Sequence, residues 1–105
     1  MNNFDVWLDR NLQGIELEKC GQEQSAIRLY ELNVADNCEG SHPYDRLAIL
    51  YRKQKRYDEE IRVLEHAIYV FENLVNPLRG DRLPKLERYK KRLLKAIELH
   101  QKYTL

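Results

Sequence analysis

The stretch from Tyr44 to Ile68 constrains the fold most, because its apolar residues recur at helical spacing on both sides of a short polar run. One stripe precedes the run and another follows it: Tyr44, Leu47, Ala48 and Tyr51, then Tyr57, Ile61, Leu64, Ala67 and Ile68. Residues 52–56 are wholly polar, and the acids at 58–60 stand where a helix N-terminus favours negative charge. The pattern predicts two helices folded into a hairpin that turns near Lys55.

The residues before this hairpin carry start and stop signals. Gly40 is suited to the turn that ends the preceding helix, where a left-handed backbone is common. Ser41 is a candidate N-cap for the next helix, and Pro43 fits its first turn. The end of the preceding helix and the start of the hairpin are therefore both marked.

A weaker copy of the same unit lies 34 residues earlier. The small residues Gly14 and Ala48 coincide, at a position where two helices of a hairpin approach closely. Gly21 lies opposite Lys55, at a turn where glycine takes a left-handed conformation. The other coinciding pairs are Leu17 with Tyr51, Lys19 with Lys53, Ile27 with Ile61, Tyr30 with Leu64 and Glu31 with Glu65.

With this period, the stretch resembles a tetratricopeptide repeat over about a quarter of the chain, and residues 11–33 resemble one more weakly. The family's aromatic, Leu-Ala, Tyr, turn, Tyr and final Ala slots hold Tyr44, Leu47-Ala48, Tyr51, Lys55, Tyr57 and Ala67. Lys55 replaces the turn glycine, and Glu60 replaces a small alanine, which is expected to loosen the hairpin slightly. The resemblance implies an all-α, right-handed stack of antiparallel helical hairpins, an α-solenoid.

We expect a single domain over residues 1–105, with repeat-like hairpins at about 7–40 and 41–74 and a capping helix at about 83–101. The first two helices are expected at 4–19 and 22–36, which gives five in all. The apolar stripes of the flanking helices are Phe4, Trp7, Leu8, Leu12 and Ile15, then Ala26, Ile27, Tyr30 and Val34, and finally Leu86, Tyr89, Leu93, Leu94 and Ile97.

The charge changes sign along the chain. Lys and Arg number three against eight Asp and Glu in residues 1–40, six against six in 41–75, and nine against three in 76–105. Such asymmetry steers an acidic partner or favours head-to-tail association, although a solvated lysine-rich helix also explains it.

The sequence has few candidates for catalytic or metal-binding residues. The three histidines lie in separate elements without metal-ligand spacing, and Cys20 and Cys38 are expected to be free thiols. Neither a phosphate-binding glycine loop nor a long apolar run is present. We therefore expect a cytoplasmic, non-enzymatic protein with no cofactor, no metal and no membrane association.

The resemblance implies that function lies in a concave groove lined by the first helix of each hairpin, which would bind a peptide or partner helix. The predicted groove residues are Asn11, Ile15, Lys19, Asp45, Ile49, Arg52, Lys53, Arg88 and Arg92. In the chaperone-binding members, Lys, Asn and Arg grip a peptide's terminal carboxylate; Asn11, Arg52 and Lys53 form a partial set, and Asp45 would repel that ligand.

Two alternatives remain open. Acidic helices of one copy would meet the basic last helix of another in a homodimer or other homo-oligomeric assembly. The basic helix, with Tyr89 among its cations, would otherwise bind nucleic acid, although the acidic first third disfavours this reading.

Overall fold

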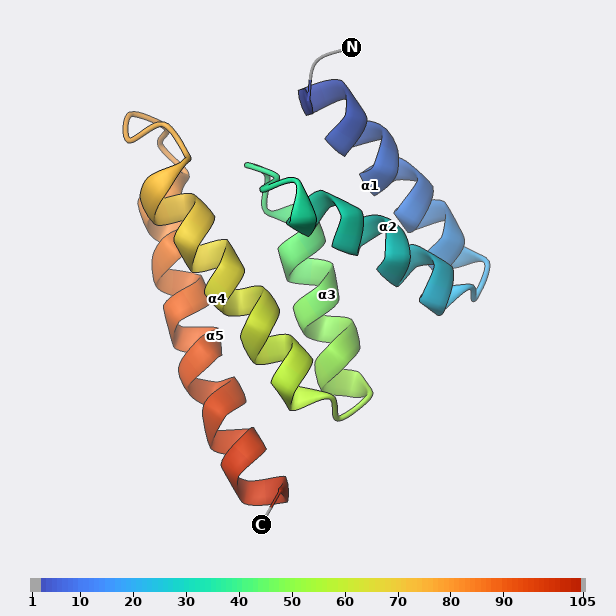
Figure 1. Cartoon of the computed structure of the whole chain (residues 1–105), viewed down its shortest axis with the longest axis vertical. Helices are drawn as coiled ribbons and strands as arrows, with labels where there is room; N and C mark the ends of the chain where they lie inside the picture. Colours follow the sequence, from blue (N-terminus) through green and yellow to red (C-terminus); the bar gives the residue numbers. More distant parts are fainter. Residues whose placement is uncertain (1–2, 105) are drawn as a thin grey trace.

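In the computed structural model, residues 3–104 are described and form five α-helices without a strand (Figure 1). The helices are α1 (Asn3–Lys19), α2 (Glu23–Ala35), α3 (His42–Lys53), α4 (Tyr57–Asn73) and α5 (Arg82–Tyr103). The predicted all-α fold with five helices is confirmed, and the predicted ends are within about two residues. Among residues 3–104, no helix has the length and hydrophobicity needed to cross a membrane.

Helices that follow one another in the chain pack side by side. α1 runs antiparallel to α2, α3 runs antiparallel to α4, and α5 lies along α4 (Figure 1). α2 joins the two hairpins because it contacts both α3 and α4. The result is a slab of 46 × 35 × 18 Å with α1 and α5 at opposite ends (Figure 1). This order of contacts is consistent with a helical stack.

The two interhelical turns within the hairpins have the same geometry 34 residues apart. Gly21 has φ +75° and Lys55 has φ +59°, both left-handed. Gln22 N–H donates to the Leu17 carbonyl at 2.8 Å, and Arg56 N–H donates to the Tyr51 carbonyl at the same distance. Both turns thus close with the six-residue hydrogen bond that commonly ends a helix. The turn expected at Gly21 is confirmed.

The approach of α1 to α2 depends on Gly14. It is the buried residue of α1, and a Cβ at its position would lie 2.4–2.9 Å from ring atoms of Tyr30. Tyr30 is fully buried and donates a hydrogen bond from its hydroxyl to Glu18 at 2.6 Å. The absence of a side chain at 14 therefore makes room for a fixed ring.

An aromatic cluster holds α3, α4 and α5 together. The rings of Tyr44, Phe71 and Tyr89 are fully buried and meet edge to face, with centroids 5.4–6.5 Å apart. Such edge-to-face pairs contribute about 0.5–1.5 kcal/mol beyond their buried area. The Tyr44 hydroxyl donates to the Cys38 carbonyl at 2.6 Å, which anchors the α2–α3 loop to the same cluster.

Two local predictions before α3 are wrong. Asn37, with φ +56°, and not Gly40, takes the left-handed conformation after α2, and Cys38 N–H donates to the Asn33 carbonyl at 3.0 Å. Asparagine tolerates this region because its short polar side chain bonds locally. Ser41 occupies the N-cap position, but its side chain makes no cap hydrogen bond because the residue is already helical at φ −80°. Pro43 does lie in the first turn.

The apolar stripe of α1 is less buried than its spacing suggests. Phe4, Leu8 and Leu12 are 67%, 47% and 54% exposed, and Trp7 and Ile15 are half-buried. The reason is that α1 packs chiefly on α2, so only a narrow face is covered. Leu94 of α5 is likewise 70% exposed, whereas Leu86 and Tyr89 are buried as expected.

We expect Gly14→Ala to destabilise the fold by about 1–3 kcal/mol, because the added methyl group overlaps the immobile Tyr30 ring. This outcome is opposite in sign to the usual gain of about 1 kcal/mol when alanine replaces a helical glycine. The measurement is urea unfolding followed by far-UV circular dichroism. Gly80→Ala is the matched control, since a Cβ there meets nothing within 4 Å. Equal stability of the two variants would contradict the close approach.

Candidate functional site: a cleft between α1 and α5

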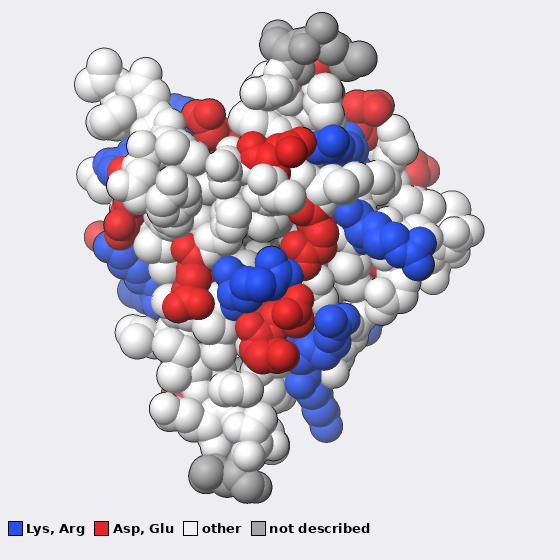
Figure 2. Space-filling model, in the orientation of Figure 1, with Lys and Arg blue, Asp and Glu red and all other residues white. Residues whose placement is uncertain are grey.

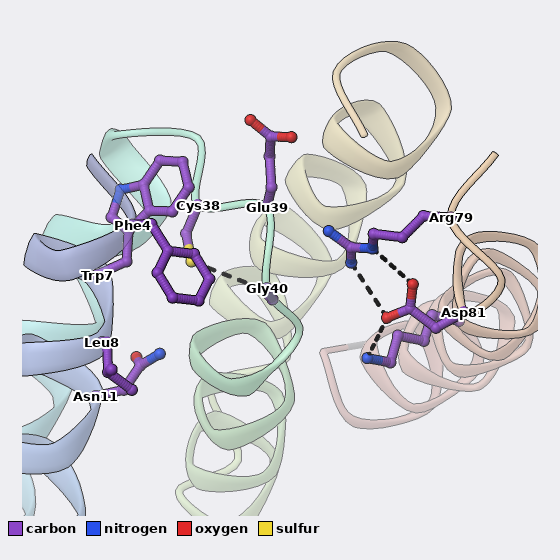
Figure 3. A pocket seen from close by; sticks show the side chains of 10 residues that line it. Phe4, Trp7, Leu8, Asn11, Cys38, Glu39, Gly40, Arg79 and Asp81 are labelled. Carbon is purple, nitrogen blue, oxygen red and sulfur yellow. Dashed lines mark hydrogen bonds and ion pairs between the residues drawn. The ribbon is translucent and has the colours of Figure 1, made fainter. Parts of the chain in front are cut away.

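A cleft of about 490 Å³ opens between the first half of α1 and the start of α5 (Figure 3). Its base is the α2–α3 loop, and its second wall includes the α4–α5 loop. The residues that line it are Phe4, Trp7, Leu8, Asn11, Cys38, Glu39, Gly40, Arg79, Asp81 and Lys85. Its volume is within the range of about 300–1,000 Å³ that is typical of ligand pockets.

The α1 wall is apolar and is fixed from behind by Asn33 of α2. Asn33 is fully buried, and its Nδ2 donates to the Trp7 carbonyl and to Asn11 Oδ1, both at 2.9 Å. Its Oδ1 accepts from Arg10 at 3.2 Å. These bonds set the rotation of α1, which leaves Phe4 and Leu8 toward the cleft (Figure 3). Sequence reasoning missed Asn33 because an isolated asparagine in a helical stripe gives no signal.

The opposite wall is charged and internally paired. Arg79 donates to the two oxygens of Asp81 at 2.6 and 3.2 Å, and Lys85 donates to Asp81 at 2.7 Å (Figure 3). Hydrogen bonds from Arg79 and Lys85 hold the pKa of the Asp81 carboxyl well below its usual range. Two cations thus share one carboxylate, and the wall keeps one positive charge.

The base of the cleft contributes a thiol and a carboxylate. Cys38 is buried and free, and burial raises the pKa of its thiol. A thiol of this kind is a poor nucleophile, because the thiolate is the reactive form. Glu39 stands between the two walls (Figure 3), which makes it the acidic group at this end of the cleft.

Beyond the cleft, ion pairs connect α1, α3 and α5. Of the predicted groove residues, the structure brings Asp45, Arg88 and Arg92 together. Arg88 Nη2 lies 2.9 Å from both carboxylate oxygens of Asp45, and Arg92 Nη1 lies 3.4 Å from one of them. On the other side of α3, Arg46 donates to both oxygens of Glu18 at 2.6 and 3.1 Å. The three helices therefore share one polar surface.

The electrostatics of Glu18 combine two opposing effects. Burial raises the pKa of its carboxyl. Hydrogen bonds from Arg46 and Tyr30 together lower that pKa by more than burial raises it, so the net shift is downward. Nearby, burial and then the charge of Arg46 lower the pKa of His42. Glu18 is thus an anion at neutral pH, held in a fixed position by Arg46 and Tyr30.

The remaining predicted groove residues are dispersed. Asn11 lines the cleft, Ile15 is half-buried and Ile49 is exposed. Lys19 lies 3.3 Å from Glu16, and Lys53 lies 2.8 Å from Glu23 of α2. Arg52 turns to α4, where its Nε donates to the buried Glu60 at 2.8 Å.

Charges of opposite sign interleave on the surface. On the face in Figure 2, Lys and Arg side chains lie next to Asp and Glu side chains, with no division into an acidic and a basic half. The cross-helix pairs explain this pattern, because acids of one hairpin bond cations of the next element: Glu18 with Arg46, Glu23 with Lys53, Glu31 with Arg62, Asp45 with Arg88, and Glu72 with Lys90.

Within residues 3–104, no group of three or more His, Cys, Asp or Glu side chains is placed to hold a metal ion. The cleft offers apolar surface on one wall, two cations that share a carboxylate on the other, and a second carboxylate, Glu39, between them.

We expect Arg52→Met to destabilise the fold by about 2–3 kcal/mol, because it leaves the buried Glu60 carboxylate without its cation. Adding Glu60→Ala should restore most of that loss, since the small residue removes the stranded charge. Urea unfolding of the two single variants and the double variant gives the coupling energy. Additive effects would show that the two side chains act independently.

Arg46→Met should reduce stability at pH 7 by about 1 kcal/mol and have a smaller effect as the pH falls. The pKa of Glu18 is lowered in the folded state, so its contribution is present above the unfolded pKa of about 4.3 and is lost as the pH falls through the folded value. Unfolding of both proteins between pH 7 and 2.5 tests this. A difference that does not depend on pH would mean that Arg46 acts by packing alone.

Comparison with known proteins adds no family to this description. No family model matches the chain, and neither a curated protein nor a solved structure matches it. The function is therefore inferred from the surface of the molecule.

Proposed function

We propose that this protein is a non-enzymatic interaction module of tetratricopeptide-repeat type, a right-handed stack that binds a peptide segment or partner helix in the cleft between α1 and α5. The observation that carries the proposal is the exposed apolar wall of Phe4 and Leu8, which faces a charged wall in which Arg79 and Lys85 share one carboxylate. Side chains of this size are rarely left in water without a partner surface when they line a cavity together.

The equivalent turns at Gly21 and Lys55 support the repeat architecture, because they place two hairpins in the same register. Stacked hairpins of this kind bind ligands on the side formed by the first helix of each unit. In this chain the ion pairs of Glu18 and Asp45 link α1, α3 and α5, the helices that would form that side. The cleft lies at one end of it.

The walls indicate what kind of segment fits. Apolar side chains would pack on Phe4 and Leu8, and carboxylates would approach Arg79 and Lys85, which share the single carboxylate of Asp81. Binding energy in such clefts comes from a few buried apolar anchors, while charges set orientation and association rate. A segment with apolar side chains on one face and acidic ones on the other satisfies both walls.

Nucleic-acid binding by α5 is less favoured. Tyr89, the aromatic residue among its cations, is fully buried, and Arg88 and Arg92 bond Asp45. Stacking on a base would require an exposed ring.

Selection of peptides from a random display library, followed by titration of ¹⁵N-labelled protein with the selected sequences, tests the proposal. We expect shift changes at residues of both walls and at least a tenfold loss of affinity in Leu8→Asp, which places a charge on the apolar wall. Leu78→Asp is the control, because Leu78 is 91% exposed and does not line the cleft. Shift changes confined to α2 and α4, or equal affinity of both variants, would reject the cleft as the binding site.

A further inference from the structure

A second apolar hollow, shallow and wide open to solvent, lies on one face of α1, away from the cleft. It has a volume of about 410 Å³ and is lined by Leu12, Gln13, Glu16 and Leu17. Two acids stand at its rim: Glu16, which lies 3.3 Å from the exposed Lys19, and Asp9, which accepts a hydrogen bond from Gln13 at 2.8 Å. We call this surface the acidic end face. Leu12, Gln13 and Glu16 are exposed on it, whereas Leu17 also packs against the core.

The opposite end of the slab has a matching protrusion. Leu94 of α5 is 70% exposed, and Lys91 and Lys95 beside it are also exposed. We call these three residues the basic end face. Lys95 is 3.4 Å from Glu98, a pair between two exposed groups that contributes little. An apolar side chain surrounded by cations is the complement of an apolar hollow with an acidic rim.

The charges of the two end helices support the match. α1 contains four Asp and Glu against two Lys and Arg, whereas α5 contains two Asp and Glu against eight Lys and Arg. Part of the α5 charge is used internally, by Arg88 and Arg92 with Asp45 and by Lys90 with Glu72. No described residue lies within ion-pair distance of Lys91. The formal charges of the two end helices are opposite in sign, and α1 and α5 lie at the two ends of the slab (Figure 1).

We propose that the occupant of the acidic end face is a second copy of this chain, with Leu94 of one copy inserted between Leu12 and Leu17 of the next. Lys91 and Lys95 then lie beside Asp9 and Glu16. The two surfaces differ, so the contact is heterologous and leaves an unfilled end on each side of a dimer. Association is therefore open-ended: trimers and longer chains form as concentration rises. The cleft is not part of this contact, so this inference does not rest on the proposed function.

One leucine, one hollow and two or three ion pairs make a small interface, well below the standard size of about 1,600 Å². We therefore expect weak association, with dissociation constants of about 100 µM at low salt. Salt should weaken it further, because the lysines and acids are exposed to solvent.

Sedimentation velocity and light scattering of the full chain from about 10 µM to 1 mM, at low and high salt, measure the average mass. The expected result is a mass that rises past twice the monomer value at low salt and falls at high salt. A mass that stays at the monomer value at 1 mM and low salt, or that stops at the dimer, overturns the proposal, because a closed dimer requires identical surfaces.

Two variants sharpen this test. Leu94→Asp removes the protrusion and Leu12→Asp blocks the hollow, so each should remain monomeric alone. Mixed in equal amounts, they should form a dimer and nothing larger, because one retains a hollow and the other a protrusion. A mixture that stays monomeric overturns the proposal.

Leu78→Asp is the matched control, since Leu78 is 91% exposed and belongs to neither end face. It should associate like the unmodified chain. Circular dichroism confirms that each variant is folded, and Lys91→Glu replaces Leu94→Asp if that variant has lost helix. Loss of association in the Leu78 variant as well would overturn the assignment to the end faces.

Discussion

The contact among Tyr44, Phe71 and Tyr89 is the interaction on which the rest of the molecule depends. Each ring comes from a different helix, so the cluster joins α3, α4 and α5 at one point. With α5 held there, Arg88 and Arg92 reach Asp45 of α3, and the start of α5 becomes a wall of the cleft. The Tyr44 hydroxyl also holds the loop that forms the base. The cleft is thus a consequence of core packing and does not need a separate framework.

Local features of this fold could be predicted from the sequence, and long-range polar contacts could not. The helices follow from apolar spacing, and the two hairpin turns follow from the 34-residue match of Gly21 with Lys55, because both signals depend on neighbouring residues. The prediction that Glu60 loosens the hairpin stays a prediction. Arg52 from the facing helix bonds one of its buried oxygens, and the other has no hydrogen-bond partner among the described residues. This contact depends on how two helices meet, and no periodicity encodes it.

The solvent exposure of apolar side chains could not be predicted from the sequence either. An apolar stripe such as Phe4, Leu8 and Leu12 predicts that a helix has an apolar face, but not how much of it a neighbour covers. Because α1 packs chiefly on α2, and Asn33 sets its rotation, the stripe is divided between the cleft and the acidic end face. The residues to which we assign binding are therefore those whose burial the helical pattern predicts least well.

The charge gradient along the chain also has a structural meaning. In a stack, each hairpin touches only its neighbours, so acids of one unit are best placed opposite cations of the next. Glu23 with Lys53 and Glu72 with Lys90 follow this rule inside the molecule. The same rule, applied past α5, leaves a surplus of cations at one end and of acids at the other. In the association that we propose, these charges bring the ends of two copies together, and Leu94 and the α1 hollow give the contact a defined position.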